Sequence, residues 1–352
     1  MIGPDDLRAA VAAGTLTEAQ AANLSTLAEA RRTGRAGLRA GEEPFELFRG
    51  FNEIFIVAGL GILALGWVGI WTFQIINSGD FRLSATLAGI ATLAIVAGLA
   101  EYFVRRRRMV APAIVLTIAW GITVLGTAAT WTEGLTLFGG VDPEGGTVAL
   151  AATVAATFLF WVRYRVPFAM AIMAASAFGA LILVLTAASG QAVTSDNLFD
   201  LSASAPFAGG TLIFGLCLFA LAMWFDMGDP HRVGLRASNG FWLHVLAAPA
   251  IVNTVAPTLI EIGTAPALSG LALLLILIAG IAVVIDRRSF LIAAMGYTVA
   301  LVSVAFDGRG VSVAILLLGA ALVGLGAAWQ RVRAVMMRPV PRALRRGLPP
   351  SA

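Results

Sequence analysis

The sequence predicts an all-α membrane protein, a polytopic bundle of transmembrane helices, and three observations support this. Of 352 residues, 59% are hydrophobic and 12% are charged, whereas soluble domains carry about 25% charged residues. Apolar runs of roughly 20 residues follow one another, each long enough to cross a hydrocarbon core of about 30 Å. Arginines gather in alternate connections between these runs. A water-soluble globule with this composition would lack the polar surface it needs.

Charged and turn residues divide the apolar runs into ten predicted spans. Their limits are 54–76, 83–104, 109–132, 147–162, 166–188, 206–225, 240–261, 266–285, 289–306 and 311–330. Successive connections lie on opposite sides of the membrane. Only Arg82 and Arg309 then fall on the side opposite the N-terminus, and the other 24 − 2 = 22 basic residues lie on the same side as the N-terminus. Short arginine-rich connections stay in the cytoplasm. Both termini are therefore expected to be cytoplasmic.

Tryptophans give a second indication of sidedness, because their rings favour the headgroup level of the bilayer. Two of them fall at predicted outer ends and four at predicted inner ends: Trp71 and Trp131, then Trp161, Trp224, Trp242 and Trp329. The tryptophans thus agree with the arginine count.

Three predicted spans open alike after an arginine, which suggests a repeat. They begin "MVAPAIVLTIAW" at 109, "VPFAMAIMAASAF" at 166 and "SFLIAAMGYTVAL" at 289. The spacings are 166 − 109 = 57 and 289 − 166 = 123 residues, near one and two units of about 60. One interpretation is tandem helical hairpins hinged at the cytoplasmic face. The other is that every inner connection looks this way under the positive-inside rule.

The organisation has three parts: a cytoplasmic helical hairpin with linker and interfacial helix at 1–48, the ten-helix domain at 49–330, and a basic cytoplasmic tail at 331–352. In the hairpin, Gly14 is placed to end a first helix, and Thr17 with Gln20 forms a capping box for a second. The hairpin is too small to be stable alone, so it is expected to dock on the membrane part or on a cytoplasmic protein partner. Its second helix has no basic face, so nucleic-acid binding is not expected.

Charged residues at the span ends are expected to pair or to anchor the protein. Arg49 and Glu53 are four apart and can pair along a helix face, as can Glu101 and Arg105. Two basic segments suit anionic lipids: the run Arg105, Arg106, Arg107 and Arg108, and the 331–346 tail. The alternative is that both segments only anchor the topology.

The N-terminal quarter resembles a family of bacterial membrane proteins called domain of unknown function 2157. The resemblance rests on the hairpin "LRAAVAAGTLTEAQAANL" before the glycine-rich span "VAGLGILALGWVGI". The sequence departs from the family where a tryptophan-centred motif follows the first span, since "WTFQIINSGDF" matches it only loosely. The resemblance implies a location in the bacterial inner membrane and no activity.

Catalytic and cofactor motifs are absent from the sequence. It contains no HExxH, GxSxG, Cys-x-x-Cys or Walker motif and no lysine. It has two histidines and one cysteine, Cys217. Glu53, Glu101, Asp226, Glu261 and Asp286 all fall within about a turn of a predicted helix end, so a proton path through a mid-membrane carboxylate is not expected. Neither an enzyme, a metal site nor a cofactor is expected.

The span at 240–261 holds the strongest candidate residues. His244 and Asn253, nine residues apart, project from roughly opposite faces, and Pro249 and Pro257 could break the helix as in transporters. With Tyr297 they are candidates for binding a substrate. The alternative is structural, with a neutral histidine and an asparagine making hydrogen bonds between helices.

Two functional hypotheses follow. The first is a transporter-like or permease-like protein that handles a neutral or weakly charged small molecule. The second is a non-enzymatic scaffold or regulator that acts through its N-terminal hairpin.

Overall fold

The computed structural model describes residues 4–18, 20–21, 24, 51–132, 140–202, 205–230, 232, 234–287, 297–304, 311–341, 345 and 348–349. The chain divides into two compact units, Met1–Glu43 and Pro44–Ala352. The first boundary predicted from the sequence was after residue 48.

In the first unit, helix α1 spans Pro4–Ala12. Gly14 follows it with φ of +71°, a left-handed conformation that glycine adopts without strain. The Thr17 N–H donates to Gln20 Oε1 at 3.0 Å, and the Gln20 N–H donates to Thr17 Oγ1 at 3.3 Å. These reciprocal bonds confirm the predicted capping box.

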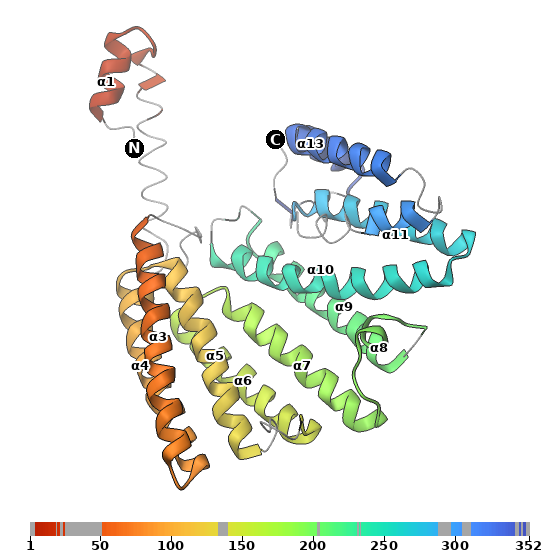
Figure 1. Ribbon diagram of the computed structural model, residues 1–352. Coiled ribbons are helices and arrows are strands. Elements are labelled where there is room, and N and C mark those ends of the chain that lie inside the picture. Colours follow the sequence, from red (N-terminus) through yellow and green to blue (C-terminus); the bar gives the residue numbers. More distant parts are fainter. Residues whose placement is uncertain are drawn as a thin grey trace. The chain divides into compact units, whose positions relative to one another are not determined.

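In the second unit, helices follow one another with short connections (Figure 1). They are α3 (Phe51–Asn77), α4 (Phe81–Ala100), the π-helix η1 (Glu101–Arg106), α5 (Val110–Thr132), α6 (Pro143–Tyr164), α7 (Ala169–Ser189), α8 (Ser195–Phe199), α9 (Ala205–Met227), α10 (Leu235–Ile262), α11 (Ala265–Val284) and α13 (Val311–Met336). Within the described residues, nine helices are long and apolar enough to cross a membrane. This confirms an all-α, multi-pass architecture. Of the predicted span 289–306, residues 297–304 are described and are helical, and the remainder lies outside the described residues.

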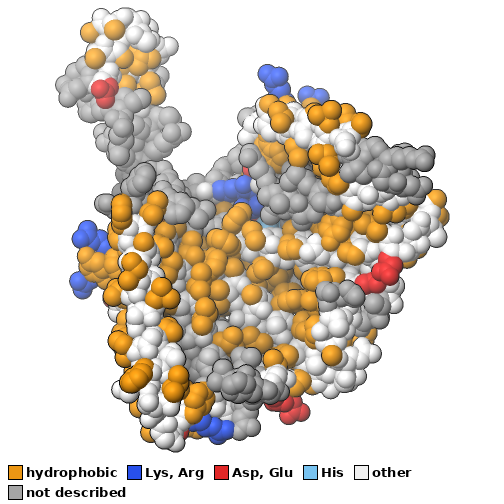
Figure 2. Space-filling view, in the orientation of Figure 1, with side chains coloured by type: hydrophobic (Ala, Val, Ile, Leu, Met, Phe, Trp, Pro, Cys, Tyr) orange, Lys and Arg blue, Asp and Glu red, His pale blue; other side chains and the backbone are white. Residues whose placement is uncertain are grey.

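Helices that are adjacent in the sequence pack side by side, and three apolar clusters hold them together. One cluster joins α4, α5 and α6 around Phe160, a second joins α7, α9 and α10 around Leu243, and a third joins α10 and α11 around Leu271. Apolar side chains also cover the outer surface of the helices (Figure 2). Leu65 on α3 and Val323 on α13 are 76% and 74% exposed. Such a surface is stable in lipid but not in water.

The connections use two kinds of left-handed residue, one at each end of the bundle. Among the residues that the structure describes, the non-glycine residues with positive φ are Arg108, Arg165, Arg232 and Asp286, which lie in connections predicted to be inside. In the other connections, the left-handed residues are Gly140, Gly190 and Gly263. We call the first end, residues 101–109, 164–168, 226–234 and 285–287, the arginine end. The second, residues 140–146, 190–202 and 262–265, is the glycine end.

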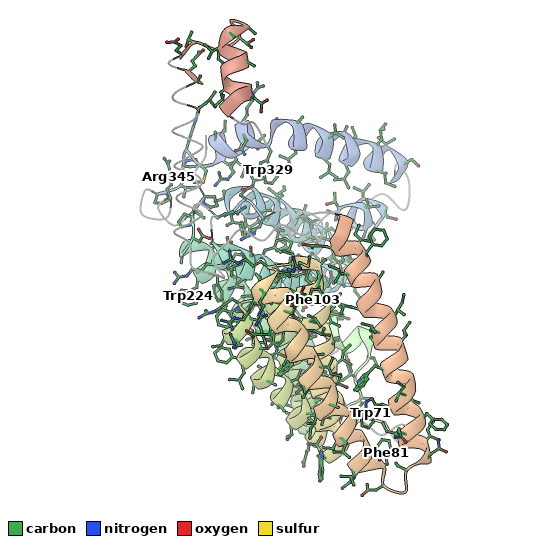
Figure 3. All side chains as sticks on the ribbon, turned by 90° about the vertical axis from the view of Figure 1, so that its left-hand side faces the viewer. Trp71, Phe81, Phe103, Trp224, Trp329 and Arg345 are labelled. Carbon is green, nitrogen blue, oxygen red and sulfur yellow. The ribbon has the colours of Figure 1, made fainter. Side chains whose placement is uncertain are left out.

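Contacts join the connections of the arginine end to one another. Arg163 donates to Glu101, and Arg287 donates to Asp226. The ring of Phe168 lies edge-on to that of Trp242, with 4.7 Å between the ring centroids. Trp224 and Trp329 lie toward this end, and Trp71 and Phe81 lie toward the opposite one (Figure 3). Trp71, Trp224 and Trp329 therefore lie toward the two ends of the bundle to which the sequence assigns them.

The predicted repeat has one structural counterpart. Arg108 and Arg165 are left-handed, directly precede the segments that begin at 109 and 166, and are 165 − 108 = 57 residues apart. The first two predicted repeats therefore share a left-handed residue at the same position as well as a sequence pattern. The opening of the third unit, at 289, lies outside the described residues.

Candidate functional site: a buried ionic lock on helix α10

Within the described part of the chain, a group of buried charged side chains lies at the arginine end and centres on Asp226, in the last turn of α9. Arg287, just beyond α11, donates from Nη2 to Asp226 Oδ1 at 2.5 Å and from Nε to Asp226 Oδ2 at 3.0 Å. His244 Nε2 on α10 lies 3.1 Å from Asp226 Oδ2. The exposed fractions of Asp226, His244 and Arg287 are 5%, 0% and 8%. We call these three residues the ionic lock.

A glycine allows the helices to meet closely enough for the lock to form. A Cβ on Gly240 of α10 would lie 2.5 Å from Asp226 Oδ1 and 3.1 Å from the Ala222 carbonyl oxygen. Arg287 also donates to the Ala237 carbonyl, in the first turn of α10, at 2.7 Å. One guanidinium therefore ties α9, α10 and the segment after α11 together.

A second ion pair joins the same two connections as the first. Arg232, in the connection that follows Asp226, donates to Asp286 Oδ2 at 3.0 Å and to the Ile285 carbonyl at 2.8 Å. Trp329 of α13 donates its Nε1–H to Asp286 Oδ1 at 2.7 Å. Burial, followed by the nearby positive charge of Arg287, lowers the pKa of the Arg232 guanidinium. Each connection thus supplies one carboxylate and one guanidinium to the other.

Burial changes the free energy of the Asp226–Arg287 ion pair in two opposing ways. A bidentate Arg–carboxylate pair is among the stronger polar contacts in proteins, but taking both charges out of water offsets much of its attraction. Removing one partner leaves an uncompensated buried charge, at a cost of about 3–5 kcal/mol. The lock is therefore stable when it is complete and unfavourable when one of its partners is removed.

The predicted helix break is wrong. Helix α10 runs without interruption from Leu235 to Ile262, through both Pro249 and Pro257. His244 and Asn253, nine residues apart, are separated by about 14 Å along a helix that rises 1.5 Å per residue. The structure does not bring these two candidate residues into one site.

The structure does join the other two candidate residues. Tyr297 donates its hydroxyl to Asn253 Oδ1 at 3.1 Å. Because Pro257 has no N–H, the Asn253 carbonyl cannot make the usual helical bond to the residue four positions on. Asn253 thus places an amide, and a carbonyl that lacks this helical bond, in the half of α10 nearer the glycine end.

The predicted end pairs have different outcomes. Arg105 donates to Glu101 Oε1 at 2.5 Å, and Arg163 donates to Glu101 Oε2 at 3.0 Å. Glu53 is 3% exposed and accepts from the Ala111 N–H at 3.1 Å, at the start of α5. Its expected partner Arg49 lies outside the described residues.

One tail arginine turns inward, contrary to the expectation that the 331–346 tail faces lipid head groups. Arg333 is 1% exposed and donates to the carbonyls of Val284, at 3.4 Å, and Pro349. Leu348 packs against the apolar cluster of α10 and α11. The end of the chain therefore returns to the bundle.

At the glycine end, Asp200 is held by a tight turn. The Ser202 hydroxyl lies 2.7 Å from both Asp200 carboxylate oxygens, and the Ser202 N–H donates to Oδ1 at 2.9 Å. These bonds, the hydroxyl first, hold the pKa of the Asp200 carboxyl below its ordinary value. They stabilise the ionised form.

Sequence reasoning placed Asp226 and Asp286 at helix ends but missed the lock. The signal was present in two segments, "FDMGDPHR" before α10 and "IDRR" after α11, since each offers an acid and an arginine at the same end of the bundle.

A scan against protein-family models and searches of curated proteins and of solved structures each found no match to this chain.

Proposed function

We propose that this integral membrane protein is transporter-like and carries a neutral or weakly charged small molecule along α10, with the arginine end in the cytoplasm. The observation that carries the proposal is that one helix holds both a polar pair in its outer half, Asn253 with Tyr297, and the ionic lock at its inner end. Alternating access opens a fixed binding site to one side of the membrane at a time, and the lock is the proposed inner gate.

The polar pair suits a ligand without a strong charge. An amide and a phenol offer donors and acceptors, and the Asn253 carbonyl lacks its helical partner because of Pro257. Asn253 and the neighbouring Val255 are only half-buried. These groups favour a molecule that forms hydrogen bonds over an ion.

The lock supports a closed inner side. Although Asp226 and Arg287 lie at helix ends, they are only 5% and 8% exposed, so the lock is a buried charge pair and not a solvated one. Asp226 and Arg287 join the inner ends of three neighbouring elements, so their separation would let those ends part. The state described here is then closed at the arginine end.

Thiol labelling tests the proposal. Cys217, which is exposed on α9, is replaced by serine, and a single cysteine is placed at Asn253. Intact cells are treated with a membrane-impermeant methanethiosulfonate reagent, with a cysteine at the exposed loop residue Gln191 as the positive control. Labelling at 253 is the expected result. A folded variant that labels at 191 and not at 253 would have a sealed core, and the transport proposal would be abandoned.

A scaffold or regulator is the second candidate, and one observation favours it. Residues Met1–Glu43 form a compact unit of their own, in which Thr17 and Gln20 cap a helix start by reciprocal hydrogen bonds. If 253 is sealed, deleting residues 1–43 should abolish the cellular phenotype of the gene while the bundle keeps its thermal stability. An unchanged phenotype would count against the scaffold.

A further inference from the structure

Positive charge is distributed unevenly over the arginine end, and this is not required by topology. Residues 101–108 with 161–168 contain six arginines and one glutamate, so their net charge is 6 − 1 = +5. Residues 226–236 contain two aspartates and two arginines and are neutral, apart from His231. Residues 285–288 contribute 2 − 1 = +1. Of the 5 + 0 + 1 = 6 excess positive charges in these four connections, five lie in the connections α4–α5 and α6–α7.

The two regions also use their arginines differently. Around α10, Arg287 and Arg232 are bound by Asp226 and Asp286 inside the protein. In the connections α4–α5 and α6–α7 the guanidiniums are exposed, and Arg105 and Arg163 share the single carboxylate of Glu101. Their excess charge is exposed on the protein surface, and arginines close to a membrane surface attract anionic lipids.

The shared glutamate makes the two connections one surface. Glu101 binds Arg105 from the first connection through Oε1 and Arg163 from the second through Oε2. Tyr164 adds a second tie, since its hydroxyl donates to the Ala97 carbonyl at 3.1 Å. Arginines from two loops are thereby kept on either side of one carboxylate.

Two more arginines lie on aromatic rings. The Arg107 guanidinium lies 5.6 Å from the centroid of Tyr102, and its Nε donates to the Tyr102 hydroxyl at 3.2 Å. The Arg165 guanidinium lies 5.1 Å from the centroid of Trp161. Stacking limits the freedom of a long side chain, so less entropy is lost when the guanidinium binds a phosphate.

We infer that this surface, Arg105 to Arg108 with Arg163 and Arg165, binds the head group of an anionic phospholipid that carries two phosphates, of the diphosphatidylglycerol class. Arginine forks bind phosphate oxygens in pairs. A head group with two phosphates can place one on each connection, on either side of Glu101, whereas a head group with one phosphate can use only one. The site stands independently of the proposed transport function.

The test is a titration of the purified full-length chain, in a neutral detergent, followed by native mass spectrometry. The probes are diphosphatidylglycerol, phosphatidylglycerol, phosphatidylcholine and pyrophosphate. One diphosphatidylglycerol molecule is expected to bind per chain, at least tenfold more tightly than phosphatidylglycerol, with no saturable binding of phosphatidylcholine. Pyrophosphate binding as tight as that of the lipid would assign the surface to a soluble phosphate and overturn the inference.

Variants locate the site. Arg107→Gln with Arg165→Gln should weaken diphosphatidylglycerol binding about 25-fold, since each arginine near a membrane surface contributes about fivefold. The matched control, Arg331→Gln with Arg338→Gln, removes the same charge from exposed positions on and after α13. An equal loss in both pairs would mean diffuse attraction only and would refute a defined site.

A conservative pair guards against misfolding. Arg107→Lys with Arg165→Lys keeps the charge and should bind the lipid within about fivefold of the unchanged protein, because only the fork geometry is lost. If these variants and the glutamine pair elute as the unchanged protein does in gel filtration, and the glutamine pair still binds normally, the inference fails.

Discussion

Replacing Arg287 by alanine is the most direct perturbation of the lock. The change removes both bonds to Asp226, at 2.5 and 3.0 Å, and the bond to the Ala237 carbonyl. Asp226, which is 5% exposed in the unchanged protein, then keeps His244 beside it and has lost its guanidinium partner. An uncompensated buried charge costs about 3–5 kcal/mol of unfolding free energy.

Removing both charges should cost less than removing one. In Asp226→Leu with Arg287→Met, two apolar side chains replace the pair, and such exchanges are often neutral or stabilising. The double variant is therefore expected to be more stable than Arg287→Ala by at least about 2 kcal/mol. Arg331→Ala, at an exposed position, is the control and should lie within about 0.5 kcal/mol of the unchanged protein.

Reversible unfolding in mixed micelles, followed by tryptophan fluorescence as the fraction of dodecyl sulfate rises, measures these differences. If Arg287→Ala costs less than about 1 kcal/mol, or if the double variant is as unstable as the two single variants combined, the lock is not an isolated charge pair and the reasoning is refuted.

Three further changes test neighbouring features by the same unfolding measurement. Gly240→Ala should cost about 1–3 kcal/mol, because the new methyl would meet Asp226 Oδ1 at 2.5 Å; an unchanged value would contradict the close approach. Tyr297→Phe removes the hydrogen bond to Asn253 and should cost about 0.6 kcal/mol, so a loss above about 2 kcal/mol would mean that the pair does more than join two helices. The folded-state pKa of Asp200 is below its ordinary 3.8, so its contribution is full above that value and is lost as the pH falls through the folded pKa. Asp200→Asn should flatten that part of the pH profile, and a profile identical to that of the unchanged protein would refute the assignment.

Much of the fold could be predicted because the bilayer imposes simple rules on sequence. Apolar length fixes a span, so most limits of the described helices agree with the predicted ones to within about five residues; the span predicted at 54–76, for example, is α3 at 51–77. The capping box of Thr17 and Gln20 was predictable because its partners are three residues apart.

Tertiary pairing could not be predicted in the same way. Asp226 and Arg287 are 61 residues apart, and Asn253 and Tyr297 are 44 apart. Sequence places each of them at a depth in the membrane, but which helices are neighbours depends on packing and on positions such as Gly240. The expected break at Pro249 was wrong because membrane helices tolerate proline when surrounding groups satisfy the freed backbone.

The central claim is that the Asn253 site is closed toward the arginine end by the ionic lock. The measurement that tests it most directly is the labelling rate of a cysteine at 253, in inside-out vesicles, with an impermeant thiol reagent. It is made once with the lock intact and once with Arg287→Ala, both without Cys217. The account predicts slow labelling with the lock and labelling at least tenfold faster without it. Equal rates in the two proteins, with a normally reactive loop control, would show that the lock does not close the path.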